Sequence, residues 1–132
     1  MKQGMIGYGK RVLVVDDDEN MRNSIAAVLE EVGFMIMLAG NGLQALDEMR
    51  RRHFDVVVTD CQMSWMNGLE FLNHSRVFWP ETPVIIVSGI QSDGPGPETP
   101  RGAFAWIQKP YPVAALYQVL SEALRYRRKS AS

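Results

Sequence analysis

The sequence contains 132 residues, 46% of them hydrophobic and 22% charged, which is the composition of one ordinary globular domain with a single core. Its 14 Lys and Arg balance 15 Asp and Glu to a net charge of -1, so no basic excess is available for binding nucleic acid or an anionic membrane surface. A single cysteine, Cys61, excludes an internal disulfide, and no apolar run approaches the roughly 18 residues of a membrane span, so we expect a cytoplasmic domain.

Five strands are expected along the chain. Three runs, Val12–Val15, Val56–Val58 and Val84–Val87, are apolar without alternation. Such runs are typical of strands that are buried on both faces of a parallel sheet. Two weaker strands are expected at Phe34–Leu38 and Phe104–Gln108.

Helical patterns fill most of the gaps between the expected strands. The first, Met21–Val32, carries an apolar stripe at helical spacing and ends at Gly33. Asn41 can cap a second helix, a third begins near Gly68, and the last follows Pro112, a residue suited to a first helical turn. Strand and helix thus alternate, and right-handed crossovers predict an α/β doubly wound sheet with helices on both faces.

The segment Gln91–Gly102 breaks this alternation. Its sequence, QSDGPGPETPRG, holds three prolines and three glycines where a fourth helix is expected. Each proline inside a helix costs about 3 kcal/mol, and each glycine about 1 kcal/mol, relative to alanine. We therefore expect the fourth helix to be missing or irregular.

The expected organisation is a single domain at residues 10–126. It is preceded by residues 1–9, a glycine-rich segment that lacks the apolar centre of a signal peptide and is expected to be flexible. Residues 127–132 are expected to be a basic polar tail, whose positive charge suits the C-terminal end of a helix.

Polar side chains follow four of the five expected strands. Asp16 and Asp17 come after the first, Asp60 ends the third, Ser88 follows the fourth and Lys109 follows the fifth. In an open parallel sheet the ligand site lies outside the carboxyl ends of the strands. These five residues are therefore the candidate site.

The carboxylates among them predict a bound cation. Two like charges about 4 Å apart repel by about 4 kcal/mol at an effective dielectric constant near 20, and a cation is the usual remedy. Clustered oxygens suit Mg²⁺, which keeps several waters and accepts one or two carboxylates, whereas a calcium loop would spread its ligands over twelve residues. Helix capping is the alternative use of this acidic run, and Asp18 is placed to serve it.

Ser88 and Lys109 extend this interpretation from a metal to a phosphoryl group. Taken singly, a hydroxyl at a strand end and a solvated lysine need no function. Together, a hydroxyl and an ammonium directed at one acidic pocket are what the oxygens of a transferring phosphoryl group require.

These residues and their surroundings resemble the receiver domains of bacterial two-component response regulators over roughly Lys10–Tyr126. The matching segments, in the family's order and spacing, are RVLVVDDDENMR, FDVVVTDCQMSWMNGLE, TPVIIVSG and WIQKPYP. The resemblance implies a flavodoxin-like fold with a five-stranded parallel sheet of order 2-1-3-4-5. The chain would then be a receiver domain that either stands alone or is detached from a larger protein.

The resemblance also implies the roles of the acidic residues. Asp60 would be the phosphoacceptor. Asp16 and Asp17, with Asp60 and the backbone carbonyl of Gln62, would bind Mg²⁺ or Mn²⁺. The phosphoryl donor would be the phosphohistidine of a histidine kinase or of a histidine phosphotransfer protein, and the domain would catalyse only its own phosphorylation and slow dephosphorylation.

Three further roles follow from the same resemblance. Lys109 would pair with the phosphoryl group, and the bond between Lys109 and Pro110 is often cis in this family. Ser88 would swing toward the new phosphoryl oxygens, and Trp106, at the position of the family's switch aromatic, would follow and change the binding of a downstream protein. Tryptophan is bulkier than the usual tyrosine or phenylalanine, so fixed packing of Trp106 is the alternative.

Two other functions compete with this one. Haloacid-dehalogenase-like phosphatases also use an aspartate and Mg²⁺ at strand ends, and Asp16 and Asp18 have their Asp-x-Asp spacing, but the chain has no room for a substrate-selecting cap. The second is a phosphorylation-independent interaction module in which the acidic pocket is vestigial. The complete set of Asp16, Asp17, Asp60, Ser88 and Lys109 disfavours it.

Overall fold

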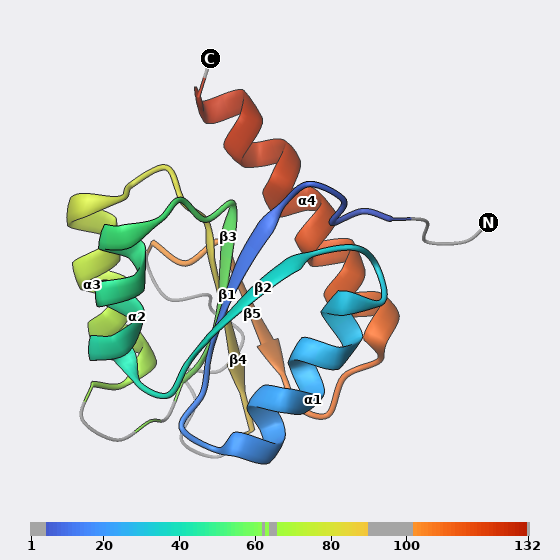
Figure 1. Cartoon of the computed structure of the whole chain (residues 1–132), viewed down its shortest axis with the longest axis horizontal. Coiled ribbons are helices and arrows are strands. Elements are labelled where there is room, and N and C mark those ends of the chain that lie inside the picture. The colour runs from blue at the N-terminus through green and yellow to red at the C-terminus, as the bar shows by residue number, and fades with distance from the viewer. Residues whose placement is uncertain (1–4, 62, 64–65, 90–101, 132) are drawn as a thin grey trace.

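The structure, a computed structural model, describes residues 5–61, 63, 66–89 and 102–131. Strands and helices alternate along the chain up to β4, as the sequence predicts (Figure 1). The elements are β1 (Arg11–Val15), α1 (Glu19–Glu30), β2 (Met35–Ala39), α2 (Gly42–Arg51), β3 (Val56–Asp60), α3 (Gly68–Phe78), β4 (Val84–Ser88), β5 (Ala105–Gln108) and α4 (Val113–Ala131).

The five strands form one parallel sheet in the order β2-β1-β3-β4-β5. This order is the one expected from the sequence. Val15 of β1 lies beside Thr59 of β3 in the register, so the residues that follow them, Asp16 and Asp60, are level with each other. The pairing of the two central strands therefore brings the expected acidic residues to one edge of the sheet.

Each strand buries side chains on both faces of the sheet, because successive side chains point to opposite sides. Val12 and Val14 pack with Leu29 of α1 and Leu120 of α4 in one core cluster. Leu13 and other strand residues of the opposite parity pack with α2 and α3 in a second cluster. Helices α1 and α4 thus cover one face and α2 and α3 the other, which explains why the strand sequences are continuously apolar (Figure 1).

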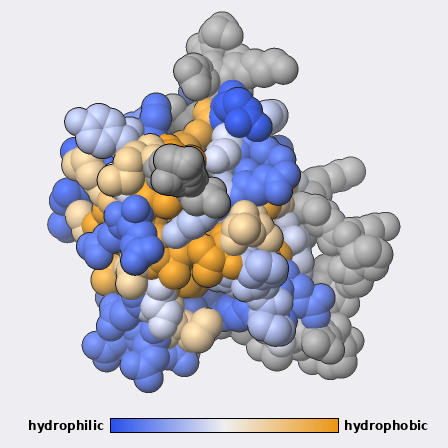
Figure 2. Space-filling view, turned by 90° about the vertical axis from the view of Figure 1, so that its right-hand side faces the viewer, coloured by the Kyte–Doolittle hydropathy of each residue, from blue (hydrophilic) through white to orange (hydrophobic). Residues whose placement is uncertain are grey.

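The cluster under α1 and α4 extends toward the surface. Figure 2 views the molecule from the side of these helices and shows an apolar area across the middle of the face, with hydrophilic residues around it. Val28 of α1 and Val119 and Leu124 of α4 are partly buried and pack against the cluster. The hydroxyl of Tyr117 donates a hydrogen bond to the Val28 carbonyl at 2.9 Å, which ties α4 to α1.

Residues 5–9 belong to the segment that was expected to be flexible. They form a turn in which the Gly7 amide donates to the Val32 carbonyl at 2.8 Å, and Ile6 packs against the core cluster of α1 and α4. At the other end of the chain, α4 continues through the expected polar tail as far as Ala131.

The expected irregular segment, Gln91–Gly102, lies outside the described residues except for Gly102. In the part of the chain that the structure describes, no helix lies between β4 and β5. None of the helices in that part is long and apolar enough to cross a membrane.

Burial predicts very different costs for two leucine substitutions in helices. Leu120 of α4 is 0% exposed and Leu43 of α2 is 54% exposed. We expect Leu120→Ala to lower the free energy of unfolding by about 2–5 kcal/mol, because it removes buried apolar contacts and leaves a cavity. Leu43→Ala, which makes the same change on a helix, should alter the free energy of unfolding by less than about 0.5 kcal/mol. Urea unfolding measures both, and equal losses would contradict the described core.

Candidate functional site

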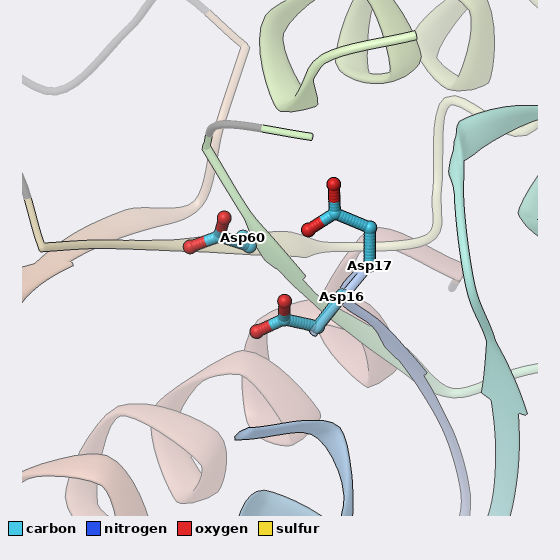
Figure 3. A group of neighbouring side chains, drawn as sticks. All are labelled: Asp16, Asp17 and Asp60. Carbon is cyan, nitrogen blue, oxygen red and sulfur yellow. The ribbon is translucent and has the colours of Figure 1, made fainter. Parts of the chain in front are cut away.

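Three carboxylates meet at the carboxyl edge of the sheet. Asp16 and Asp17 follow β1, and Asp60 ends β3. One oxygen of each lies within 4.8 Å of the others, and Figure 3 shows the three side chains directed into the same space. The structure thus brings together the acidic residues that the sequence singled out.

The polar atoms of Asp16 are almost all engaged. Its amide donates to the Ala39 carbonyl at 3.1 Å, and its own carbonyl accepts from Nη1 of Arg22 at 2.9 Å. Oδ1 accepts from the Asp18 amide at 3.0 Å. Oδ2 is buried and has no hydrogen-bond partner among the described residues. A buried carboxylate oxygen without a donor is costly, which makes this atom the first candidate for a cation ligand.

The surroundings of Asp16 raise the pKa of its carboxyl group above the ordinary value. The main cause is burial, since the residue is 2% exposed, and the neighbouring charges of Asp60 and Asp17 act in the same direction. The hydrogen bond from the Asp18 amide and the charge of Lys109 oppose the rise. The charged form of Asp16 therefore needs further positive charge at this edge.

The donor set fits a hard divalent cation. Three carboxylates from two strands offer oxygen ligands, and Mg²⁺ prefers oxygen. The unpartnered Oδ2 of Asp16 supports this fit, because a metal would supply the missing interaction. The fourth expected ligand, the carbonyl of Gln62, lies outside the described residues.

Lys109 reaches the phosphoacceptor candidate from β5. Its Nζ atom lies 3.3 Å from Oδ1 of Asp60, and both side chains are largely buried, with 20% and 13% exposure. The Lys109 amide donates to the Ser88 carbonyl at 2.7 Å, and the following bond to Pro110 is cis. Lys109 is therefore held at the site through both its backbone and its ammonium group.

The other two expected residues lie on neighbouring strands. Ser88, at the end of β4, is 2% exposed and pairs with Gln108 in the sheet register. Trp106 of β5 is partly buried and packs against the core cluster of α2 and α3, as do Cys61 and Met63 from the loop after β3. Trp106, Cys61 and Met63 therefore contact the same core cluster.

The contacts of two residues at the site, Gly68 and Arg22, were not expected from the sequence. Gly68 begins α3 and donates its amide to the Cys61 carbonyl at 2.8 Å, and a Cβ atom there would lie 2.5 Å from the Asp60 carbonyl oxygen. Only glycine allows α3 to start this close to β3. Arg22 lies one helical turn after Asp18, and a side chain in the first turn of a helix leans back toward the preceding loop, which was the available signal.

The chain is thus an α/β domain of flavodoxin-like topology, with three carboxylates and a lysine at the carboxyl edge of its sheet. The chain belongs to the response regulator receiver domain family, whose model matches residues 12–121. This match confirms the resemblance to receiver domains that the sequence suggested. Proteins of this family act in two-component phosphorelay signalling.

The curated relatives are longer proteins. The transcriptional regulatory protein ZraR of Klebsiella oxytoca is 38% identical over 129 residues, which cover 97% of this chain and 29% of ZraR. The regulatory protein AtoC of Escherichia coli is 33% identical over 116 residues, or 87% of this chain and 25% of AtoC. The chain therefore spans less than a third of either relative.

Solved structures show the same fold. Response regulator TrrA of Thermotoga maritima, crystallised in complex with Mg²⁺ and BeF, has a TM-score of 0.80 and 28% identity, and the match covers 87% of this chain and 99% of TrrA. NtrX of Brucella abortus, in complex with ATP, has a TM-score of 0.82 and 28% identity, with 92% of this chain and 28% of NtrX covered.

The raised pKa of Asp16 predicts how the metal-free protein responds to pH. Folding favours the protonated carboxyl, so the charged form reduces stability once the pH exceeds the ordinary pKa of about 3.9. Asp16→Asn should therefore raise the free energy of unfolding at pH 7 in the presence of EDTA, and the gain should shrink as the pH is lowered toward 4. Asp47→Asn, at a carboxylate of α2 that is 46% exposed, is the control, and urea unfolding is the measurement. A loss of stability in Asp16→Asn at pH 7 would contradict this account.

Proposed function

We propose that the chain accepts a phosphoryl group on Asp60, with a divalent cation held by Asp16, Asp17 and Asp60. The observation that carries the proposal is the unpartnered, buried Oδ2 of Asp16 in a group of three carboxylates, one of which is contacted by Lys109. A carboxylate that only stabilised the fold would be expected to have partners for both oxygens. The arrangement is incomplete without positive charge and suits a phosphoryl group that arrives with a metal.

In the proposed reaction the Asp60 carboxylate attacks the phosphorus of a phosphohistidine on a histidine kinase or a histidine phosphotransfer protein. A P–O bond to Asp60 forms as the P–N bond breaks, and the electron pair of that bond leaves with the imidazole. The product on this chain is an acyl phosphate. The chain is thus a phosphoacceptor that acts on itself rather than an enzyme with a released product.

The chain's own residues supply positioning and charge. The ammonium group of Lys109, which lies 3.3 Å from Asp60 Oδ1, would donate to a phosphoryl oxygen as negative charge moves onto the transferring group. Ser88, at the end of the adjacent strand, would donate its hydroxyl hydrogen to another of these oxygens. Mg²⁺ or Mn²⁺, when bound, would neutralise charge on the carboxylates and on the phosphoryl oxygens.

The signal would leave the site through the neighbouring strands. Ser88 moving toward the phosphoryl group would change the packing beside β5, where Trp106 packs against the core cluster of α2 and α3. Phosphorylation would in this way bias the surface seen by a downstream protein. The relatives are named as transcriptional regulators, but this chain, with its near-neutral net charge of -1, would bind a protein rather than nucleic acid directly.

Incubation with acetyl phosphate and Mg²⁺ separates the candidate functions. Phosphate that stays on the protein and maps to Asp60 supports the proposal. Turnover of many phosphomonoesters would indicate a phosphatase of the haloacid dehalogenase type. No reaction with acetyl phosphate and no transfer from any histidine kinase would indicate an interaction module with a vestigial pocket.

Asp60→Asn should abolish phosphorylation and leave the fold intact, because the substitution is nearly isosteric and removes one of three crowded charges. Mass spectrometry after acetyl phosphate treatment measures the first effect, and circular dichroism the second. Acid-labile phosphate on the Asp60→Asn protein would reject Asp60 as the acceptor.

Asp17→Ala should weaken Mg²⁺ binding by about tenfold or more, since the metal would lose one of few charged ligands. Asp47→Ala removes a carboxylate of α2 that pairs with Arg50 and Arg51 and should leave the affinity unchanged. Isothermal titration calorimetry compares the two variants. Equal Mg²⁺ affinity in Asp17→Ala and Asp47→Ala would show that Asp17 does not bind the metal.

A further inference from the structure

The guanidinium group of Arg22 is bound to the acidic edge through the backbone rather than through a carboxylate. Arg22 lies in the first part of α1, and its Nη1 atom donates to the Asp16 carbonyl at 2.9 Å. No ion pair between Arg22 and a carboxylate is found among the described residues. The guanidinium group of Arg22 thus binds the main chain at the end of β1, although three acidic side chains lie at the same edge.

This contact completes the fixation of Asp16. The residue is held on one side by the Ala39 carbonyl of β2, which accepts its amide hydrogen, and its Oδ1 is oriented by the Asp18 amide. The Arg22 contact fixes the peptide unit that joins Asp16 to Asp17. The peptide unit and one carboxylate oxygen therefore cannot turn freely, and Oδ2 is left without a hydrogen-bond partner among the described residues.

The side chains of Arg22 and Gln44 both lie near Gly40, the residue that follows β2. The Gly40 amide donates to Oε1 of Gln44 at 2.7 Å. A Cβ atom on Gly40 would lie 3.3 Å from Gln44 Oε1 and 3.4 Å from Arg22 Nη1, so the tips of both side chains lie over the glycine.

We propose that Arg22 is a positioning residue for the metal-binding carboxylates, acting through the backbone between Asp16 and Asp17. The inference rests on the proposed function, because it assumes that these carboxylates bind a divalent cation. Groups that orient metal ligands from behind typically contribute tenfold to a hundredfold in metal affinity. Arg22 would make a contribution of this kind.

The positioning role and simple electrostatics predict opposite effects of removing the charge. A cation close to the site repels Mg²⁺, so loss of the Arg22 charge alone would strengthen metal binding. Loss of the hydrogen bond to the Asp16 carbonyl would let the peptide unit turn and would weaken metal binding. The sign of the change in Mg²⁺ affinity therefore separates the two effects.

The test compares Arg22→Met and Arg22→Lys with the wild type in the full chain, with MgCl₂ as the probe and isothermal titration calorimetry as the measurement. Methionine keeps an unbranched side chain with good helix propensity but has neither charge nor donor. We expect Arg22→Met to bind Mg²⁺ about tenfold or more weakly than the wild type. Arg22→Lys, which can still donate to the Asp16 carbonyl, should bind Mg²⁺ more tightly than Arg22→Met. Arg50→Met, at a 64% exposed arginine of α2, is the matched control and should bind like the wild type.

Thermal unfolding of each variant shows whether the fold is retained. A folded Arg22→Met protein that binds Mg²⁺ as tightly as the wild type, or more tightly, would overturn the inference and leave the proposed function standing. If the wild type itself binds no Mg²⁺, the proposed function fails, and this inference fails with it.

Arg22→Ala provides a second route if Arg22→Met does not fold. Alanine also lacks the charge and the donor, and it has the highest helix propensity. We expect Arg22→Ala to fold and to bind Mg²⁺ more weakly than the wild type. Unchanged or tighter binding in a folded Arg22→Ala protein would also overturn the inference.

Discussion

Crowding of three carboxylates at one edge of the sheet is the constraint on which the rest of the site depends. Their oxygens lie within 4.8 Å of one another, a separation at which each pair of charges repels by roughly 3–4 kcal/mol at an effective dielectric constant of 20. Burial of Asp16 adds to this cost, and its raised pKa reflects it. Lys109 offsets part of the repulsion, and the remainder favours a divalent cation and the phosphoryl group that would come with it.

The fold holds these charges together because the backbone around them is fixed. The parallel register of β1 and β3 makes Asp16 and Asp60 neighbours regardless of their charge. The close start of α3 at Gly68 fixes the end of β3, and the cores on both faces of the sheet keep the strands in place. The two apolar layers thus stabilise a fold that holds three like charges at one edge.

The sheet and most residues of the site could be predicted from the sequence, because continuous apolar runs are typical of buried parallel strands and the polar residues follow directly after them. The strands that begin near Val12, Val56 and Val84 are where the patterns predict them, as are the acidic and hydroxyl groups at their ends. The ammonium group of Lys109 likewise follows the predicted last strand. The contacts of Arg22 and Gly68 could not be predicted in the same way. They depend on how two segments approach each other in space, and neither a hydrogen bond to a backbone carbonyl nor a clash that only glycine avoids leaves a periodic signal in the chain.

Under the proposed function, Asp16, Asp17 and Asp60 bind a divalent cation at this edge. Paramagnetic broadening by Mn²⁺ in the NMR spectrum of the ¹⁵N-labelled chain locates the bound metal, because broadening falls off steeply with distance from the metal. At low Mn²⁺ concentration the amide signals of these three residues should broaden first, and excess Mg²⁺ should restore them. Broadening that begins instead at another acidic group, such as Asp47 of α2, while the signals of Asp16, Asp17 and Asp60 remain sharp, would contradict the account.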